Sequence, residues 1–478
     1  MKQTILILTL LCAATITQAQ VGIGTTSPAA SAQLDVTSTT KGLLPPRMTS
    51  TQRDAIASPV AGLMIWCTET LELQVYNGTR WINSTGSGPS CILLGSDIDG
   101  EAADDRYGWS VSLSSDGSTV AIGAPYNDGN GSYSGHVRIY KNISGTWTQQ
   151  GSDIDGEAAS DQSGSSVSLS TDGSVVAIVG RYNNGSGSYS GHVRIYKNIS
   201  GTWTQQGSDI DGEAANDESG FVSLSSDGST VAIGAPNNDG SGSNAGHVRV
   251  YENISGTWTQ VGSDIDGEAA NDRSGESVSL SSDGSVVAIG ARYNDGTAFD
   301  AGHVRVYENV SGTWTQVGAD IDGEAANDYF GSVSLSSDGS TVAIGAYMND
   351  GNGASAGRVR IYKNVSGTWT QLGADIDGEK AGDGMGELGS VSLNSDGSIL
   401  AIGVSAADNT GVNKGGVYIY QYISGTWTQI RSTIYGEAAN DGSGSSVSLS
   451  SDGSTVAIGA RYNDGTASDA GHVRVYAK

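Results

Sequence analysis

The sequence predicts an all-β fold, and two observations support this prediction. The first is composition: 70 of the 478 residues are glycine, accompanied by many Ser, Thr, Asn and Asp, and these residues tolerate the backbone angles of tight turns. The second is a repeat, because a phrase that begins Gly-Ser-Asp-Ile-Asp-Gly-Glu in its first copies recurs every 55 to 58 residues. Short apolar runs and turns alternate inside each copy, which is typical of short antiparallel strands.

Seven repeats follow one another, and each predicts four strands. They begin at Gly95, Gly151, Gly207, Gly262, Gly318, Gly373 and Arg431. In the first repeat, period-two alternation predicts strands at 110–114 and 136–140, a more apolar run predicts one at 119–124, and Thr-Trp-Thr-Gln at 146–149 predicts the fourth. Four antiparallel strands in about 56 residues, repeated in this way, predict a seven-bladed β-propeller.

The two ends of the repeat array predict a closed ring. The seventh repeat reaches Lys478 directly after its third strand and lacks the fourth. The missing piece precedes the first repeat, because Cys91 to Gly95 aligns with Trp147 to Gly151. We therefore expect an N-terminal strand to complete the last blade, since closure removes the exposed edge of an open array. The propeller is expected to span 91–478.

The residues before the propeller divide into three predicted parts. Met1-Lys2, an apolar run and the small-x-small site before Gln20 have the pattern of a signal peptide, 1–19. Residues 20–82 form a small N-terminal module without the repeat, and 83–90 is a Ser/Gly/Pro linker. We expect an exported protein without a transmembrane segment. The sequence leaves cell surface, medium and periplasm open.

Charge excludes some classes of partner. The chain has 51 acidic and 24 basic side chains, a formal charge of −27. This field repels nucleic acid and anionic membrane surfaces, so cations, glycans and proteins remain as partners. Two cysteines follow the signal peptide, Cys67 and Cys91. Export permits a disulfide between them, and two buried thiols are the alternative.

Short motifs recur at fixed places in the repeats. Phe330-Gly331 and Tyr107-Gly108 open the first strand, and Gly123-Ala124-Pro125 closes the second. In these motifs the repeats resemble the FG-GAP repeats of integrin α-subunit propellers and their bacterial relatives, over about Ile92 to Lys478. The resemblance implies an adhesion-type role at a cell surface. It does not carry over the integrin calcium sites, because the turn at 114–118 is too short for that ligand set.

A second motif lies in the N-terminal module. The run Lys41 to Met48 reads Lys-Gly-Leu-Leu-Pro-Pro-Arg-Met. With it, residues 20–90 are similar to a short module of exported Bacteroidetes proteins, some of them related to phage tail-fibre parts. This resemblance implies a surface or stalk setting and an oligomer, such as a trimer, formed through the module.

The loops that join consecutive repeats carry most of the acidic residues, on one predicted face together with the loops between second and third strands. Three or four carboxylates within nine residues suit a cation, with calcium as the candidate cofactor. The alternative is turn chemistry, because Asp accepts backbone N–H bonds and tolerates left-handed geometry. The candidate metal ligands are Asp153, Asp155, Glu157, Asp161, Asp209, Asp211, Glu213, Asp217, Asp264, Asp266, Glu268 and Asp272.

Histidine and tryptophan recur at single positions of the repeat. The histidines open third strands, and we interpret them as packing or hydrogen-bonding residues, since a zinc or catalytic site needs different groups at one point. The tryptophans mark the fourth strand, and we interpret them as contacts between blades, with sugar stacking as the alternative. The two sets are His136, His192, His247, His303 and His472, and Trp147, Trp203, Trp258, Trp314, Trp369 and Trp427.

Near-identical blades favour a binding protein over an enzyme, because an active site gathers several different groups. No catalytic residue is predicted. The irregular sixth and seventh repeats supply the candidate ligand-binding residues, Glu387, Asp408, Lys414 and Tyr435. The leading hypothesis is a secreted or cell-surface binding or adhesion-type protein that recognises an extracellular protein or glycan through its acidic loop face. The alternatives are a polysaccharide-active enzyme with its site at blades 6 and 7, and a structural surface or fibre component.

Overall fold

The computed structural model describes residues 21–29, 31–84, 86, 88–407 and 413–477. The predicted signal peptide, 1–19, therefore lies outside the described residues. The chain divides into two compact units, Met1–Thr79 and Arg80–Lys478, and each is treated by itself. Within the described ranges, no helix has the length and apolar character needed to cross a membrane.

The first unit is a small β-structure with one short helix. Its elements are β1 (Val21–Ile23), β2 (Leu34–Val36), β3 (Arg47–Met48), α1 (Ser50–Asp54), β4 (Met64–Cys67) and β5 (Glu72–Tyr76). Strands β1 and β2 are parallel, β3 is parallel to β4, and β4 is antiparallel to β5. A capping box between Thr49 and Gln52 begins the helix. The buried Arg53 guanidinium donates to Gln74 Oε1 at 2.6 Å, which fixes the helix against β5.

The second unit opens with β6 (Trp81–Asn83) and then forms seven antiparallel sheets, the blades. The first strands are β9 (Ser110–Leu113), β14 (Ser163–Leu169), β19 (Phe221–Leu224), β24 (Ser277–Leu280), β29 (Phe330–Leu335), β34 (Val391–Leu393) and β39 (Ser443–Leu449). The second strands are β10 (Thr119–Ala124), β15 (Val175–Gly180), β20 (Thr230–Ala235), β25 (Val286–Ala291), β30 (Thr341–Ala346), β35 (Ile399–Val404) and β40 (Thr455–Ala460).

The outer part of each blade consists of the third and fourth strands. The third strands are β11 (His136–Ile143), β16 (His192–Ile199), β21 (His247–Ile254), β26 (His303–Val310), β31 (Arg358–Val365), β36 (Gly416–Ile423) and β41 (His472–Ala477). The fourth strands are β12 (Thr146–Gln149), β17 (Thr202–Gln205), β22 (Thr257–Gln260), β27 (Thr313–Gln316), β32 (Thr368–Gln371), β37 (Thr426–Gln429) and β7 (Ile92–Leu93).

Each blade also has a fifth strand of two residues, which the sequence pattern did not predict. It pairs with the beginning of the third strand, beside the fourth. These strands are β13 (Ile154–Asp155), β18 (Ile210–Asp211), β23 (Ile265–Asp266), β28 (Ile321–Asp322), β33 (Ile376–Asp377), β38 (Ile434–Tyr435) and β8 (Ile98–Asp99). The third strand also continues to Ile143, so Ser144 and Gly145 alone make the turn, with φ of 53° and 88°.

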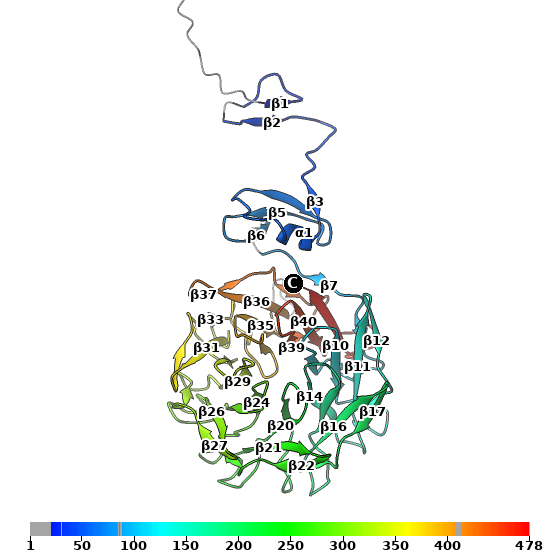
Figure 1. Cartoon of the computed structure of the whole chain (residues 1–478), viewed down its shortest axis with the longest axis vertical. Coiled ribbons are helices and arrows are strands. Elements are labelled where there is room, and N and C mark those ends of the chain that lie inside the picture. Colours follow the sequence, from blue (N-terminus) through cyan, green and yellow to red (C-terminus); the bar gives the residue numbers. More distant parts are fainter. Residues whose placement is uncertain (1–20, 30, 85, 87, 408–412, 478) are drawn as a thin grey trace, which may run out of the picture. The chain divides into compact units, whose positions relative to one another are not determined.

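The ring closes as the sequence predicted. Strand β7 pairs antiparallel with β41, with Leu93 opposite Tyr476, and β8 extends the same sheet. The first strands of neighbouring blades contact one another in an unbroken circle from β9 through β39 and back to β9. Figure 1 shows these strands around the propeller axis and the fourth strands at the rim. The prediction of a seven-bladed propeller closed by an N-terminal strand is confirmed.

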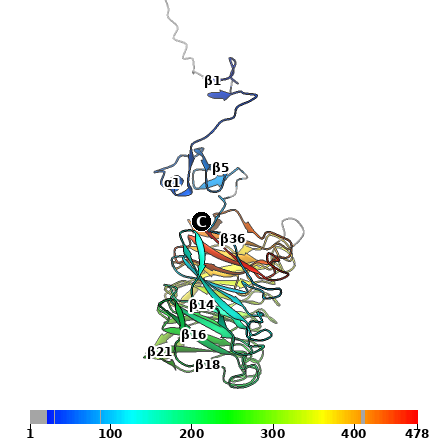
Figure 2. The ribbon, with the colours of Figure 1, turned by 90° about the vertical axis from the view of Figure 1, so that its right-hand side faces the viewer.

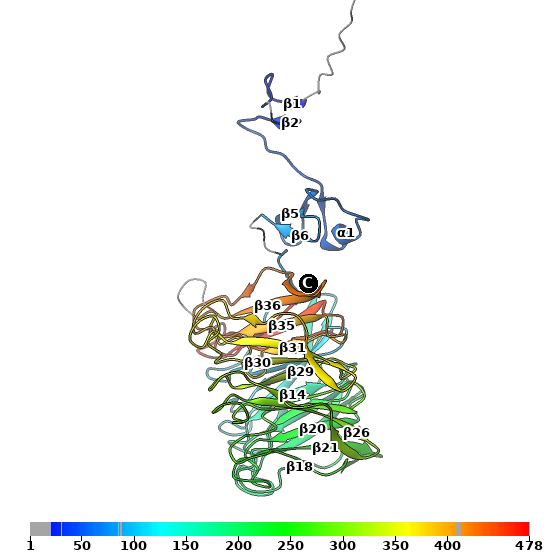
Figure 3. The ribbon, with the colours of Figure 1, turned by 90° about the vertical axis from the view of Figure 1, so that its left-hand side faces the viewer.

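The hydrophobic core lies between blades. Seven clusters of buried side chains each combine residues of two neighbouring blades, including the pair formed by blades 7 and 1. All six residues of β10 are buried, as expected of a strand covered on both faces. Figure 2 and Figure 3 show the propeller from two sides, with its loops at the two faces.

The tryptophans of the fourth strands join neighbouring blades. Trp203 Nε1 donates to the carbonyl of Gln150, the last residue of the preceding repeat, at 2.7 Å. The other five tryptophans make the equivalent bond at 2.7 or 2.8 Å. Their interpretation as contacts between blades is confirmed. The two cysteines lie in different units, Cys67 in β4 and Cys91 before β7, and a disulfide between them stays a prediction.

Candidate functional site

Many of the positions that differ between repeats gather on one face of the propeller. They follow the last acidic residue of the joining loop, open the first strand, or follow the second strand, and these points all lie at the same end of the blades. We call this surface the variable face. Its main side chains are Arg106, Trp109, Tyr126, Arg181, Glu218, Phe221, Arg273, Glu276, Arg292, Tyr293, Tyr329, Tyr347, Glu387, Arg461 and Tyr462.

Aromatic rings and guanidinium groups interleave where blades 7 and 1 meet. The Arg461 guanidinium lies 4.7 Å from the centre of the Trp109 ring, and Trp109 meets Tyr126 edge to face at 5.6 Å. Arg106 lies 4.5 Å above Tyr126 and 5.3 Å from Tyr462. These four contacts hold five half-buried side chains in fixed orientations.

Ion pairs add to the aromatic contacts at the other blades. Arg181 pairs with Glu218 of the next blade at 2.8 Å and lies 5.2 Å from the Phe221 ring. Arg292 pairs with Glu276 through Nε and Nη2, at 2.7 and 2.8 Å. Burial opposes the charge of Arg292, but the Glu276 carboxylate outweighs it and raises the pKa of this arginine. Each ion pair is therefore held in its geometry before a ligand binds, and its two charges nearly cancel.

The structure places three of the four predicted ligand-binding residues, and these three lie at two separate sites. Glu387 belongs to the variable face, where its carboxylate accepts from Ser405 Oγ at 2.9 Å and lies 3.6 Å from Arg461 Nη2. Tyr435 lies in β38 opposite Gly416, and Lys414 Nζ donates to the Glu437 carbonyl at 3.2 Å. Asp408 lies outside the described residues.

The predicted metal ligands of each loop are also separated. In the loop after blade 1, Asp153 faces His136 of blade 1, while Glu157 faces His192 of blade 2. Asp155 is exposed, and its backbone carbonyl accepts from Arg194 at 2.8 Å. The loops with Asp209, Asp211 and Glu213, and with Asp264, Asp266 and Glu268, repeat this division. Among the residues described, no group of three possible ligands comes from one loop.

The last aspartate of each loop has a structural role. Asp161 is buried and accepts from the Ala158 backbone at 2.9 Å and from Asn183 Nδ2 at 3.2 Å. Asp217 and Asp272 make the same pair of bonds in their repeats. These bonds tie the joining loop to the loop between second and third strands, as the turn-forming alternative requires.

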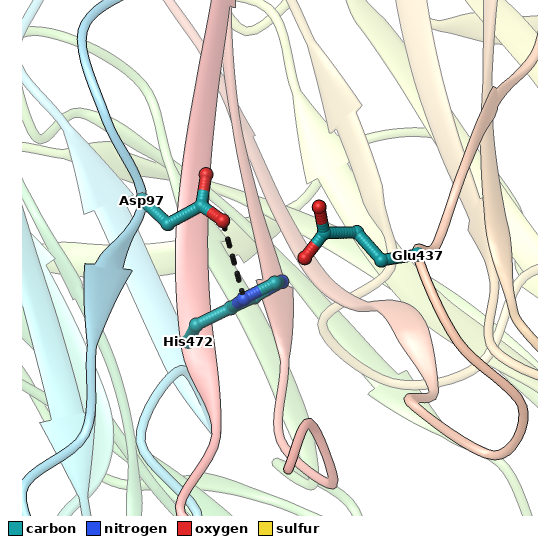
Figure 4. Close-up of side chains that lie close together, drawn as sticks. All are labelled: Asp97, Glu437 and His472. Atoms are coloured by element: carbon teal, nitrogen blue, oxygen red, sulfur yellow. Dashed lines mark ion pairs between the residues drawn. The ribbon is translucent and has the colours of Figure 1, made fainter. Parts of the chain in front are cut away.

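Because each joining loop contributes residues to two neighbouring blades, five His–Asp–Glu clusters form. In each, the ligand atoms of one histidine, one aspartate and one glutamate lie within 4.8 Å of one another. Figure 4 shows the cluster of blade 7, where the Asp97 and Glu437 carboxylates both face His472 and the Asp97–His472 distance is 3.9 Å. Burial lowers the pKa of His136 and of His303 to about 4, so these imidazoles are neutral at neutral pH.

An arginine completes the clusters at the closing blades. Arg138 Nη2 pairs with Asp153 at 2.9 Å and also with Glu101, and Arg474 pairs with Asp97 at 3.0 Å and with Glu437. Because each glutamate comes from the segment that leaves the preceding blade, these clusters bind blades together. The sequence shows that the histidine, aspartate and glutamate recur across the repeats. It does not show that they meet, because the members of each cluster come from different repeats.

A shallow groove also lies at the rim between blades 3 and 4. It has a volume of about 330 Å³, and its lining includes Asp264, Asp266, Tyr307 and Trp314. A groove of about 270 Å³ repeats the arrangement one blade later, at Trp369. Sugar stacking at these tryptophans stays a prediction, while their bond to the preceding blade is the observed contact.

Comparison with known proteins gives two family matches. Residues 22–99 match the phage tail like trimerisation region, and residues 97–140 match the FG-GAP repeat. No curated protein matches the chain. The predicted FG-GAP resemblance is confirmed, and the link to exported Bacteroidetes proteins stays a prediction.

Solved structures show a likeness in fold. A proposed 6-phosphogluconolactonase from Bacteroides uniformis is 11% identical, with a TM-score of 0.50 over 78% of this chain and 94% of that chain. The hydrazine synthase of Kuenenia stuttgartiensis is 15% identical, with a TM-score of 0.50 over 76% and 94%. At these identities the likeness concerns the fold alone. With its seven closed blades and the motif match in the first of them, the chain is a β-propeller protein that contains an FG-GAP repeat.

Proposed function

We propose that the chain is an exported, adhesion-type binding protein whose propeller recognises an extracellular protein or glycan through the variable face. One observation carries this proposal. The blades are nearly identical in most of their strands and turns, and many of the positions that differ gather on one face. A single ligand needs different groups at one place, and this face provides them.

The chemistry of the variable face suits a macromolecular ligand. Trp, Tyr and Arg are the residues that contribute most to binding energy at protein interfaces, and the contacts described above fix their orientations before binding. Further aromatic side chains on the same loops are exposed, with Tyr133 47%, Tyr189 46% and Phe299 65% accessible. Flat rings of this kind also offer stacking surfaces to sugar rings.

The first unit supports assembly into an oligomer. Its β1–β2 pair exposes Val21 by 53%, Ile23 by 56% and Leu34 by 53%, and a two-stranded sheet is marginal when isolated. Packing against other copies of the same segment would bury these apolar side chains and stabilise the two-stranded sheet. The match of residues 22–99 to a trimerisation region favours three copies. A trimer presents three propellers to a surface and raises avidity.

The experiment that tests the proposal is a binding screen with matched variants. Mature protein is applied to a glycan array and to outer-surface protein fractions, and the affinity is then measured by interferometry. We expect the double variant Trp109→Ala, Arg461→Ala to lower the affinity at least about tenfold, which corresponds to roughly 1.4 kcal/mol. The control, Ile143→Ala with Ile199→Ala, changes two exposed residues of the opposite face and should bind normally.

Two results would contradict the proposal. Equal affinity of both variants would place the ligand elsewhere, for example in the rim grooves. Release of shorter products from a bound polysaccharide, abolished by Glu387→Gln, would instead favour the enzyme alternative. Mass measurement by light scattering tests the trimer separately, since deletion of 20–79 should convert trimers to monomers.

A further inference from the structure

The His–Asp–Glu clusters of blades 2, 3 and 4 differ from those at the closing blades. In blade 2, Arg194 turns away from Asp209: its Nη2 donates to the Asp155 carbonyl at 2.8 Å, and its Nη1 lies 3.5 Å from Glu157. Arg249 and Arg305 do the same in blades 3 and 4. In these three blades the guanidinium group therefore pairs with the glutamate, and among the described residues it forms no ion pair with the aspartate.

The histidine of blade 2 is buried without a hydrogen bond. His192 is 1% exposed, and neither of its ring nitrogens has a hydrogen-bond partner among the residues that the structure describes. Its Nδ1 nevertheless points at Asp209 Oδ2, 3.5 Å away, with Glu157 as the third member of the cluster. A buried polar atom without a hydrogen-bond partner costs free energy, which indicates that a group from outside the chain bonds to this imidazole.

Blade 5 shows that a cation belongs at this point. There Arg358 replaces the histidine, and its Nη1 lies between the two equivalent carboxylates, 2.7 Å from Glu324 and 2.9 Å from Asp375. The same glutamate and aspartate positions thus hold a positive charge supplied by the chain itself. In blades 2 to 4 histidine stands instead and, in the described part of the chain, the arginine pairs with the glutamate but not with the aspartate, so the chain supplies a nitrogen ligand and leaves a positive charge between the two carboxylates to be supplied from outside.

We propose that the clusters Glu157/His192/Asp209, Glu213/His247/Asp264 and Glu268/His303/Asp320 are zinc(II) sites that join neighbouring blades. Imidazole nitrogen and carboxylate oxygen are both zinc ligands, and three protein ligands leave a fourth position for water. Ligand atoms about 2.0–2.1 Å from a tetrahedral zinc ion are about 3.4 Å apart, close to the 3.5 Å between His192 and Asp209. In blades 3 and 4 the corresponding distances are 3.7 to 3.9 Å.

Ligand chemistry favours zinc over calcium. Calcium takes six to eight oxygen ligands, whereas each cluster offers a nitrogen and a small number of oxygens. The glutamates are 43% to 48% exposed and the aspartates 28% to 31%, so an ion can enter from solvent and keep a water ligand. The excess of 51 acidic over 24 basic side chains attracts cations to these positions.

The test compares two matched triple variants of the full mature chain. After treatment with chelator, zinc is titrated and the bound metal is counted by mass spectrometry after dialysis. We expect up to three zinc ions per chain and a higher unfolding temperature with zinc, and no shift with calcium. The variant Glu157→Gln, Glu213→Gln, Glu268→Gln should lose both effects. The control Glu101→Gln, Glu324→Gln, Glu437→Gln changes the clusters filled by arginine and should retain them.

A second variant guards against misfolding. Asp209→Asn keeps an oxygen for the bond from Gln205, 2.6 Å long in the native chain, and should reduce the zinc count by one while its circular dichroism stays native. Absence of bound zinc in the native chain would overturn the proposal. Equal zinc binding by both triple variants, or equal loss in both, would also overturn it.

Discussion

Ile98 tests the closure of the ring with an internal control. It lies in β8, is 5% exposed, and pairs with Val473, at the opposite end of the propeller sequence. Ile210 holds the equivalent position in blade 2, is 6% exposed, and pairs with Val193 of the same blade, close by in the sequence. The two side chains therefore have the same environment but different distances along the chain to their partners.

The substitution Ile98→Ala removes three carbon atoms from a buried site. At about 0.8 kcal/mol per methylene, the transfer cost is roughly 2.4 kcal/mol. The cavity that remains raises the total to about 3–4 kcal/mol, within the range known for such changes. Ile210→Ala should cost the same within about 1 kcal/mol, because both sites lie between two blades of the same geometry.

Urea unfolding followed by tryptophan fluorescence measures both variants. Equal and large shifts of the transition midpoint are expected from the closed ring. If the N-terminal strands were not docked in solution, Ile98 would be exposed and its replacement by alanine would leave the midpoint unchanged, while Ile210→Ala would still lower it. That result would refute the closure inferred from the sequence and seen in the structure.

Three further predictions follow from single contacts. Hydrogen bonds from serine side chains and backbone lower the pKa of Asp283 in its turn below the ordinary 3.8. Its contribution to stability is therefore present above pH 3.8 and is lost as the pH falls through the lower pKa of the folded state. In a plot of the urea midpoint against pH, Asp283→Asn should make the fall at acid pH less steep, and an unchanged slope would contradict this. Trp203→Phe removes the bond to the Gln150 carbonyl and should lower the free energy of unfolding by about 1 kcal/mol, measured in urea against Tyr133→Phe as a neutral control. Glu276→Ala leaves Arg292 half-buried without its carboxylate and should cost about 3 kcal/mol; the double variant with Arg292→Ala should recover part of this loss, and no recovery would show that the pair is not coupled.

The sequence predicted the fold well because the repeat samples the same structure seven times. Alternation, turn residues and the missing fourth strand were enough to place four strands per blade and the closing strand. The short fifth strand was missed because Ile154 and Asp155 are two residues and show no period. Its existence depends on pairing with the beginning of the third strand, which no local pattern records.

The candidate sites were harder to predict because they join different repeats. The sequence placed Asp153 and Glu157 in one hypothetical cation site, since they are neighbours in the chain. In the structure the chain passes from one blade to the next between them, so Asp153 faces His136 and Glu157 faces His192. The partners Arg181 and Glu218 are likewise 37 residues apart. Aligning the repeats position by position, including blades 1 to 5, would have revealed the variable positions.

The repeats also separate residues that the fold requires from residues that it tolerates. Six of the seven joints between neighbouring blades use the same tryptophan bond, and the turn bonds of Asp161 recur in the same positions. By contrast, the residue after the first-strand glycine is Trp109 in blade 1, Ser165 in blade 2 and Glu276 in blade 4, although the φ of that glycine is 87°, 90° and 94° in the three blades. Since the same backbone forms with any of these side chains, folding does not explain why Trp109 is present. A role in binding does, because a ligand distinguishes side chains that the fold treats alike.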